Sequence, residues 1–394
     1  MKEKIYQEID NIKDELLDLS RKIHENPELC FEEYKSSKFI KDILKKHDFE
    51  IEENSGGIET AFKARFKGNG KGPVVAFLAE YDALPEIGHG CGHNLIAMVS
   101  TAAAIGLSKI MKNISGEIVV LGTPAEEGGG GKVILLENGE FDDIDFSLMT
   151  HPSTQALIGR GGLATTGVDL EYKGVSAHSA APEDGINALQ AVIQTFNMID
   201  SIRAQLPFKT NINGIIKKGG NAANIIPDYA SCRFSVRTRT FSDLNFVINK
   251  IKNTIEAVEK LTGAEANLNI GKAYAERYPN LTIGKTYKKY MEDQGEKVDY
   301  PDPNAKIGSS DIGNITLEMP AIHAYFKITD KDIASHSMDF TNAVITEYAH
   351  ESALKTSKAL SCAGYEILTD EKLREEILKE YTENVPKYKN LNLD

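Results

Sequence analysis

The chain has 394 residues, more than one ordinary hydrophobic core holds, so we expect two domains. Hydrophobic residues make up 41% of it and charged residues 26%, the balance typical of a globular protein. The formal net charge of −13 repels a phosphate backbone, which argues against nucleic acid as a partner.

The N-terminal segment, residues 1–23, is charged throughout and has no apolar core, so we predict no signal peptide. The most apolar helical run, Leu95 to Leu107, is too short to span a bilayer, and no membrane partner is expected. The four cysteines are scattered without a C-x-x-C pair, which is typical of free thiols in a reducing compartment. These features together predict a cytoplasmic protein.

Helix and strand patterns alternate over the first 150 residues. Two amphipathic helices separated by Pro27 come first, and buried strands then alternate with helices. The predicted elements are helices 3–26 and 31–47, strands 59–67 and 73–82, helix 94–109, strand 116–122, helix 131–139 and strand 144–150. This alternation favours an α/β layer with a largely parallel sheet.

After residue 160 the order becomes β-α-β-β-α-β, that of a ferredoxin-like unit. Its elements are strand 164–174, helix 184–206, strands 210–219 and 226–238, helix 241–261 and strand 264–274. The α/β pattern then resumes with helix 282–294, a loop at 308–314, strand 320–328 and helices 340–362 and 370–384. We therefore predict a discontinuous α/β domain, residues 1–164 and 282–394, interrupted by an inserted domain, residues 165–281.

The glycine-rich stretches fail to match several catalytic motifs. "EEGGGGKV" has Glu126 and Val133 where a phosphate-binding loop needs glycine and a serine or threonine. "GHGCGH" lacks the third glycine of a dinucleotide fingerprint. The chain has neither the G-x-S-x-G elbow of serine hydrolases nor the H-E-x-x-H of single-zinc proteases, so those classes are excluded.

Metal-ligating residue types follow three successive strands instead. "GHGCGHN" comes after the strand that ends in Asp82, and its cysteine and second histidine are two residues apart, so an extended segment would point both the same way. The next strand ends in "GTPAEE" and the one after it in "LMTHP". The candidate ligands are Cys91, His93, Glu126, Glu127 and His151. Because the carboxyl ends of parallel strands share one edge of a sheet, this pattern predicts a metal site there.

The adjacent glutamates suggest a division of labour. One carboxylate can ligate a metal while its neighbour takes a proton from an activated water molecule. A merely charged loop is the alternative, but the pair follows the apolar "IVVL" directly and precedes four glycines, which allow a backbone to approach a ligand closely.

Six stretches in this order resemble a known family: "AEYDALPEIGHGCGHN", "GTPAEEGGGGK", "THP", "GVSAHSAAP", "NIIPDYASCRFSVR" and "SHS". The resemblance is to the aminoacylase/carboxypeptidase family of dinuclear metallohydrolases, and within it to the amidohydrolase branch, which has a cysteine in the metal site. That branch includes p-aminobenzoyl-glutamate hydrolases, auxin-conjugate hydrolases, β-alanyl-dipeptide hydrolases and a methicillin-resistance-related amidohydrolase. The resemblance covers nearly the whole chain, and implies a zinc-exopeptidase-like α/β/α catalytic domain carrying a lid and dimerisation domain.

Carried over position by position, the resemblance assigns roles in the first domain. The implied metal ligands are Cys91, His93, Glu127, His151 and His336. Glu126 would be the general base and acid, and Asp82 would hold the metal-site histidine. Glu80 stands where exopeptidase relatives have a ligand histidine, so its role stays open, and His89 is expected to lie behind the ligands.

In the inserted domain, the resemblance implies that His178 reaches the active site of a partner subunit and stabilises an oxyanion. Asn224 and Arg237 would grip the substrate, Arg237 by pairing with a free carboxylate. Strand alternation alone favours a surface arginine at 237, since Arg233 and Arg239 lie on the same face. The expected assembly is a homodimer through the lid domain, or a tetramer.

The resemblance therefore implies a metal-dependent amidohydrolase with two divalent ions. It would cleave the amide bond of N-acyl amino acids or small dipeptide-like substrates with a free carboxylate. A cysteine ligand favours zinc, while carboxylate and imidazole ligands also suit manganese or cobalt. The alternatives are a dipeptidase or carboxypeptidase acting on true peptides, and a non-catalytic metal-binding scaffold, which has no need of Glu126.

Overall fold

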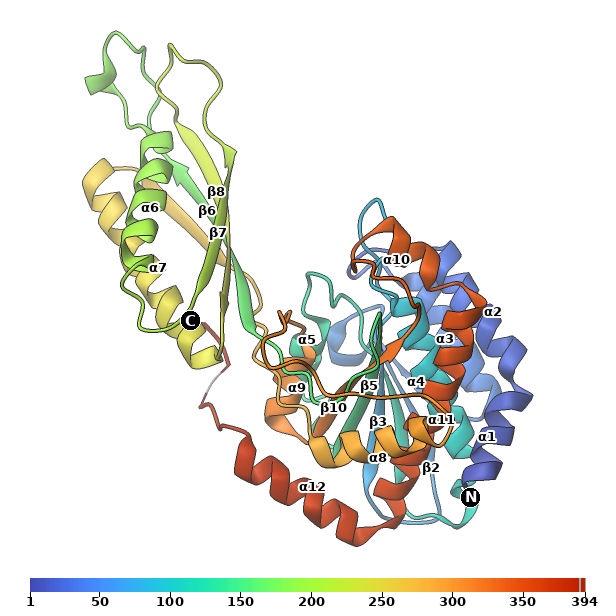
Figure 1. Ribbon diagram of the computed structural model, residues 1–394. Helices are drawn as coiled ribbons and strands as arrows, with labels where there is room; N and C mark the ends of the chain where they lie inside the picture. The colour runs from blue at the N-terminus through green and yellow to red at the C-terminus, as the bar shows by residue number, and fades with distance from the viewer. Residues whose placement is uncertain (390, 394) are drawn as a thin grey trace. The chain divides into compact units, whose positions relative to one another are not determined.

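The computed structural model describes residues 1–389 and 391–393, and the chain separates into two compact units. Unit 1 comprises residues 1–161 and 277–387, and unit 2 comprises residues 162–276 with the C-terminal segment that begins at Tyr388. The predicted fold class, an α/β/α domain with an inserted β-α-β-β-α-β domain, is confirmed (Figure 1). No helix of the described residues is long and apolar enough to cross a membrane.

Unit 1 is built on a six-stranded sheet of order β1-β2-β4-β3-β5-β10. The strands are β1 (Glu50–Glu53), β2 (Phe62–Lys67), β3 (Val74–Ala79), β4 (Glu117–Gly122), β5 (Phe146–Ser153) and β10 (Ala321–Lys327). β4, β3, β5 and β10 pair in parallel, and β1 and β2 add an antiparallel edge. The central strands are almost wholly apolar and buried because helices cover both faces of the sheet.

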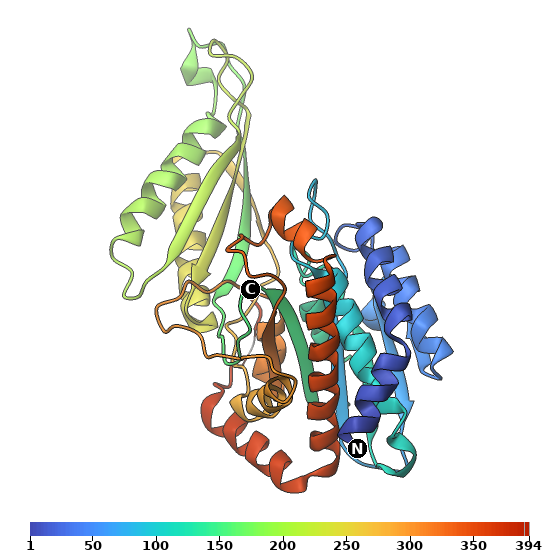
Figure 2. The same cartoon turned by 45° about the vertical axis from the view of Figure 1, so that its right-hand side comes forward.

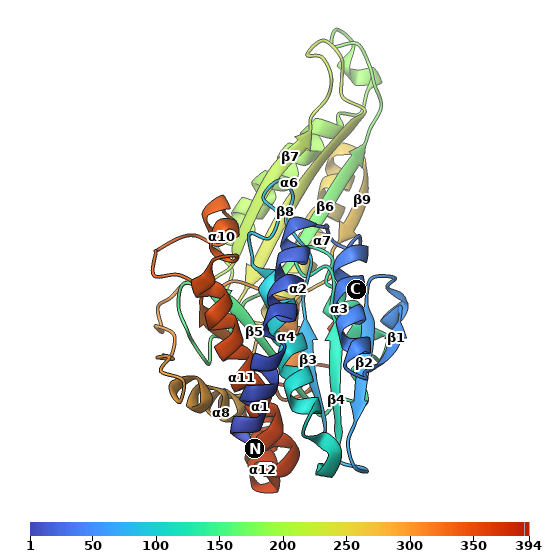
Figure 3. The same ribbon diagram turned by 90° about the vertical axis from the view of Figure 1, so that its right-hand side faces the viewer.

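One face of this sheet is covered by α1 (Lys2–Asn11), α2 (Lys13–Glu25), α3 (Tyr34–Lys46), α4 (His93–Ser108), α8 (Leu281–Glu292) and α11 (Glu347–Thr369). Figure 3 shows α1, α2, α4 and α11 in front of the strands. The other face packs against α5 (Gly131–Glu137) and α9 (Ile312–Glu318). α10 (Met338–Ala343) and α12 (Glu371–Asn384) complete the unit. Every residue of α4 is buried, because α4 lies between the sheet and the outer helices.

Several predicted elements of unit 1 differ from the observed ones. The single helix predicted at 3–26 is two helices that meet at Ile12, where no glycine or proline marks the break. The helix predicted at 340–362 is also two, because the Thr346 side chain accepts a hydrogen bond from the Ala349 N–H and caps α11. The sequence did not predict β1, or α9, which begins inside the loop expected at 308–314.

Unit 2 has the predicted order of elements. They are β6 (Ala164–Lys173), α6 (Ala188–Arg203), β7 (Asn211–Lys218), β8 (Tyr229–Thr238), α7 (Phe241–Thr262) and β9 (Glu265–Ile270). The strands form an antiparallel sheet of order β7-β8-β6-β9, and both helices lie on one face of it (Figure 2). The side chains of Asn187 and Thr240 cap α6 and α7, so α6 begins four residues later than predicted.

Candidate metal centre

Three neighbouring parallel strands bring predicted site residues to one edge of the unit 1 sheet. β3 leads into Glu80 and Asp82, the adjacent β4 leads into Glu126 and Glu127, and β5 itself carries His151. These residues are far apart in the sequence, and the parallel pairing of the strands is what gathers them.

Cys91 and His93 reach the same place through a turn. We expected an extended segment here, which is wrong: His93 is the first residue of α4, and Gly92 before it has a φ of 77°. A Cβ atom at Gly92 would lie 2.6 Å from Cγ of Pro152, so both the backbone angle and the space require glycine. The Sγ atom of Cys91 lies 3.4 Å from Nε2 of His151.

Asp82 orients two of the candidate ligands. Its Oδ1 atom lies 2.8 Å from Nδ1 of His93, and its Oδ2 atom accepts a hydrogen bond from the Glu127 N–H at 2.9 Å. A histidine that donates from Nδ1 keeps the lone pair of Nε2 for a metal. The Nε2 atom of His93 faces Oε2 of Glu80 at 3.4 Å and Oε1 of Glu127 at 3.8 Å.

The other two histidines are held by the backbone. Nδ1 of His151 lies 2.7 Å from the carbonyl oxygen of Pro152, which leaves Nε2 on the side of Cys91. His336 has a φ of 59°, rare for a residue with a Cβ atom, and its N–H donates to the Gly90 carbonyl at 2.9 Å. That bond ties the loop after β10 to the "GHGCGHN" loop and places the His336 Nε2 atom 3.4 Å from Oε1 of Glu127.

The five predicted ligands therefore come together and fit a metal site. Their ligand atoms fall into two sets, each within 4.8 Å: Cys91 with His93 and His151, and Cys91 with Glu127 and His336. The Nε2 atom of His93 and the Oε1 atom of Glu127 are buried without a hydrogen-bond partner among the described residues. Buried polar atoms normally have partners, so these two atoms fit a bound cation.

Glu126 lies beside this cluster in an environment that favours its protonated form. Burial, and then the negative charges of Glu80 and Glu127, raise the pKa of its carboxyl well above the ordinary value. Its carboxylate also groups with those of Glu80 and Asp311 within 4.8 Å.

Sequence reasoning missed a buried ion cluster next to Glu126. The Lys132 side chain is completely buried, and its Nζ atom donates to Oε1 of Glu80 at 2.5 Å and to Oδ1 of Asp311 at 2.8 Å. Asp311 also accepts a hydrogen bond from the Lys132 backbone N–H at 3.0 Å. The structure thus pairs Glu80, whose role the sequence left open, with a lysine. The signal was the lysine that opens the apolar run "KVILL".

The predicted residues of unit 2 lie in two places. His178 and Asn224 belong to neighbouring loops, joined by the Ser179 N–H that donates to the Asn224 carbonyl at 3.0 Å. Both side chains are exposed, and Nδ1 of His178 accepts a hydrogen bond from the Ala180 N–H at 3.1 Å, which leaves Nε2–H as a donor. Arg237 lies on β8, on the sheet face away from the helices.

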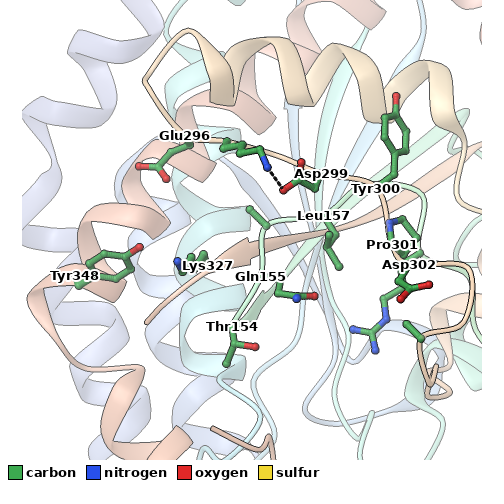
Figure 4. Close-up of a pocket in the computed structure, with 14 residues that line it drawn as sticks. Thr154, Gln155, Leu157, Glu296, Asp299, Tyr300, Pro301, Asp302, Lys327 and Tyr348 are labelled. Carbon is green, nitrogen blue, oxygen red and sulfur yellow. Dashed lines mark hydrogen bonds and ion pairs between the residues drawn. The ribbon is translucent and has the colours of Figure 1, made fainter. Parts of the chain in front are cut away.

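Two further features lie outside the ligand cluster. His89 is buried, with Nε2 3.1 Å from the Ile23 carbonyl oxygen, and burial lowers its pKa to about 3. A polar pocket of about 830 Å³ lies between segments 154–160 and 296–305 of unit 1, and no predicted site residue lines it (Figure 4). Its Lys297 forms an exposed ion pair with Asp299 at 2.8 Å.

A largely parallel α/β sheet with cysteine, histidine and paired glutamates at its carboxyl edge is typical of a metal-dependent hydrolase. Comparisons with known proteins make the class specific. The family model of the M20 peptidase dimerisation domain matches residues 158–262. The chain is 33% identical over 398 residues to the Xaa-Arg dipeptidase of Mus musculus, covering 97% of this chain and 92% of that protein.

A second match, 28% identical over 359 residues, is to the N-acetyl-L-cysteine deacetylase of Bacillus subtilis, with 84% of this chain and 85% of that protein covered. A solved structure from Bacillus subtilis, described as a dinuclear metal-binding peptidase of the M20 family, shares the fold with a TM-score of 0.66. It is 20% identical, with 91% of this chain and 99% of that chain covered. The chain belongs to the M20 peptidase family, which confirms the resemblance seen in its motifs.

Proposed function

We propose that this M20 hydrolase cleaves the amide bond of N-acyl amino acids or small dipeptide-like compounds that carry a free carboxylate. The main support is the placing of Glu126 directly beside Glu127, with its carboxylate within 4.8 Å of the ligand atoms of His93 and Glu127. A metal-binding scaffold has no use for such a group, whereas amide hydrolysis needs both a base and an acid.

The metal centre would hold two divalent ions on Cys91, His93, Glu127, His151 and His336. Such ions act as Lewis acids that polarise an amide carbonyl and make a water molecule more acidic. Zinc suits the cysteine, and manganese or cobalt suits the carboxylate and imidazole ligands.

Glu126 supplies the proton transfers. Its carboxylate oxygen takes a proton from the attacking water, and the same oxygen then gives that proton to the departing amide nitrogen. Glu126 is placed for both transfers, because its carboxylate lies within 4.8 Å of the ligand atoms of His93 and Glu127.

The inserted domain would complete the site from a second copy of the chain. β7 is an edge strand, with Ile215 and Ile216 63% and 48% exposed, and such an edge is usually protected or paired. Pairing two copies at this edge makes a two-fold dimer, and the matching family model is that of a dimerisation domain. In this arrangement the Nε2–H of His178 stabilises the oxyanion, while Asn224 and Arg237 hold the substrate.

A substrate panel tests this proposal. The chain is stripped of metal, reloaded separately with zinc, manganese or cobalt, and assayed on N-acetyl amino acids, p-aminobenzoyl-glutamate and dipeptides. We expect turnover of at least one class, and a fall in kcat of about 100- to 10,000-fold in Glu126→Gln with metal content unchanged. Turnover unaffected by Glu126→Gln would contradict the assignment.

A dipeptidase specific for basic residues is the second candidate. It is favoured by the full-length likeness to the Xaa-Arg dipeptidase and by the net charge of −13, which attracts a cationic substrate. A higher kcat/KM for dipeptides ending in arginine than for the matching N-acetyl-arginine would favour this candidate.

A further inference from the structure

Glu33 is a buried carboxylate that the roles above do not use. It immediately precedes α3 and is 0% exposed, and no lysine, arginine or histidine of the described residues forms an ion pair with it. Burial, and then the negative charge of Asp82, raise the pKa of Glu33 to about 7. A buried carboxylate without a cation is unfavourable, so its place in the fold needs another reason.

Among the described residues, all the hydrogen-bond donors to the Glu33 carboxylate are neutral. Oε1 accepts from the N–H groups of Ala125 and Phe31, both at 2.9 Å, and Oε2 accepts from the hydroxyl of Thr60 at 2.8 Å. Ala125 and Phe31 have φ values of 60° and 64°, in the left-handed region that residues with a Cβ atom seldom adopt. One carboxylate oxygen therefore holds two strained turns.

The turn at Ala125 carries the two glutamates of the metal centre. Glu126 and Glu127 follow it directly, and Asp82 accepts the Glu127 N–H at 2.9 Å. The backbone is thus held on both sides of Glu126, by Glu33 before it and by Asp82 after it.

We propose that Glu33 is a positioning residue for the reaction: by holding the Ala125 turn, its carboxylate sets the places of Glu126 and Glu127. The inference rests on the function proposed above for those two glutamates. A displacement of about 1 Å at a catalytic group costs about 100-fold in rate, so loss of this tether lowers kcat more than it changes KM.

Two conservative variants distinguish the effect of the side-chain length of residue 33 from the effect of its charge. Glu33→Gln loses the charge but keeps the oxygen that accepts from Ala125, and its amide donates to the Thr60 hydroxyl. Glu33→Asp keeps the charge but is one methylene shorter and withdraws from Ala125. Thr60→Val is the matched control, because it removes only the bond to Oε2.

Hydrogen exchange of the 120–132 segment, metal content, kcat and KM are measured for each variant. Glu33→Asp should exchange the Ala125 amide about tenfold faster, because one hydrogen bond is lost. We also expect it to bind less metal when metal is limiting, and to lose about 100-fold in kcat. Glu33→Gln and Thr60→Val should resemble the wild type in all four measurements. Introducing Ala125→Gly into Glu33→Asp should recover part of kcat, since glycine adopts a positive φ without strain.

The proposal is overturned if Glu33→Asp is active and Glu33→Gln is impaired. The charge of residue 33, rather than the length of its side chain, would then be what matters. If Glu33→Asp does not fold, Glu33→Gln decides: wild-type exchange at Ala125 supports the tether, and faster exchange refutes it. If the wild type hydrolyses nothing in the panel, the proposed function fails, but exchange and metal content still test the tether.

Discussion

Replacing Lys132 by methionine tests the buried ion cluster. Methionine has a similar length but no charge, so Lys132→Met leaves the carboxylates of Glu80 and Asp311 buried without their shared cation. Breaking a buried ion pair in this way costs about 3–5 kcal/mol of the free energy of unfolding. That is a large part of the total of about 5–15 kcal/mol typical of a folded protein.

Urea unfolding of the metal-loaded chain measures the loss. The matched control is Lys355→Met: Lys355 pairs with Glu296 at 2.5 Å, but its side chain is 38% exposed. An exposed pair of this kind contributes about 0–1 kcal/mol. Adding Glu80→Gln to Lys132→Met should recover part of the lost stability, because it removes one of the uncompensated charges. If Lys132→Met costs no more than Lys355→Met, the cluster does not stabilise the fold.

Three further predictions concern the proposed roles. Cys91→Ala should lower the metal content per chain, measured by mass spectrometry of the dialysed protein, and full occupancy would remove Cys91 from the ligand set. Arg237→Ala should weaken substrates with a free carboxylate by about 1.5–3 kcal/mol, seen mainly in KM, and leave amidated ones unchanged. Equal losses on both would make Arg237 structural. Co-expressed Glu126→Gln and His178→Ala chains should regain activity in mixed dimers, because one site then has both residues intact. Mixed dimers confirmed by mass that stay inactive would refute a site shared between two chains.

The sequence could predict that the candidate ligands gather in one place, because most of them lie at strand ends. "GTPAEE" and "LMTHP" each come at the end of an apolar strand, and the carboxyl ends of parallel strands share one edge of the sheet, so Glu127 and His151 had to lie at the same edge. The strands of unit 2 could also be predicted, because buried and exposed residues alternate along them. One face of the sheet is buried and the other is not. His336 was identified as a candidate ligand only through the family resemblance. Its position depends on a left-handed turn, which the hydrophobic periodicity of the sequence does not reveal.

What the sequence by itself determined is most of the order of elements and the residue types at the sheet edge. Both follow from local hydrophobic periodicity and from the termination of strands. Tertiary structure alone decided the contacts that surround the candidate metal centre. Lys132 meets Asp311 across 179 positions, and Glu33 meets Ala125 across 92. Such contacts join segments that are far apart in the chain, and the local sequence pattern of one segment does not predict its contact with the other. They exist because folding buries charged and polar atoms, which must then find partners wherever the packing places them.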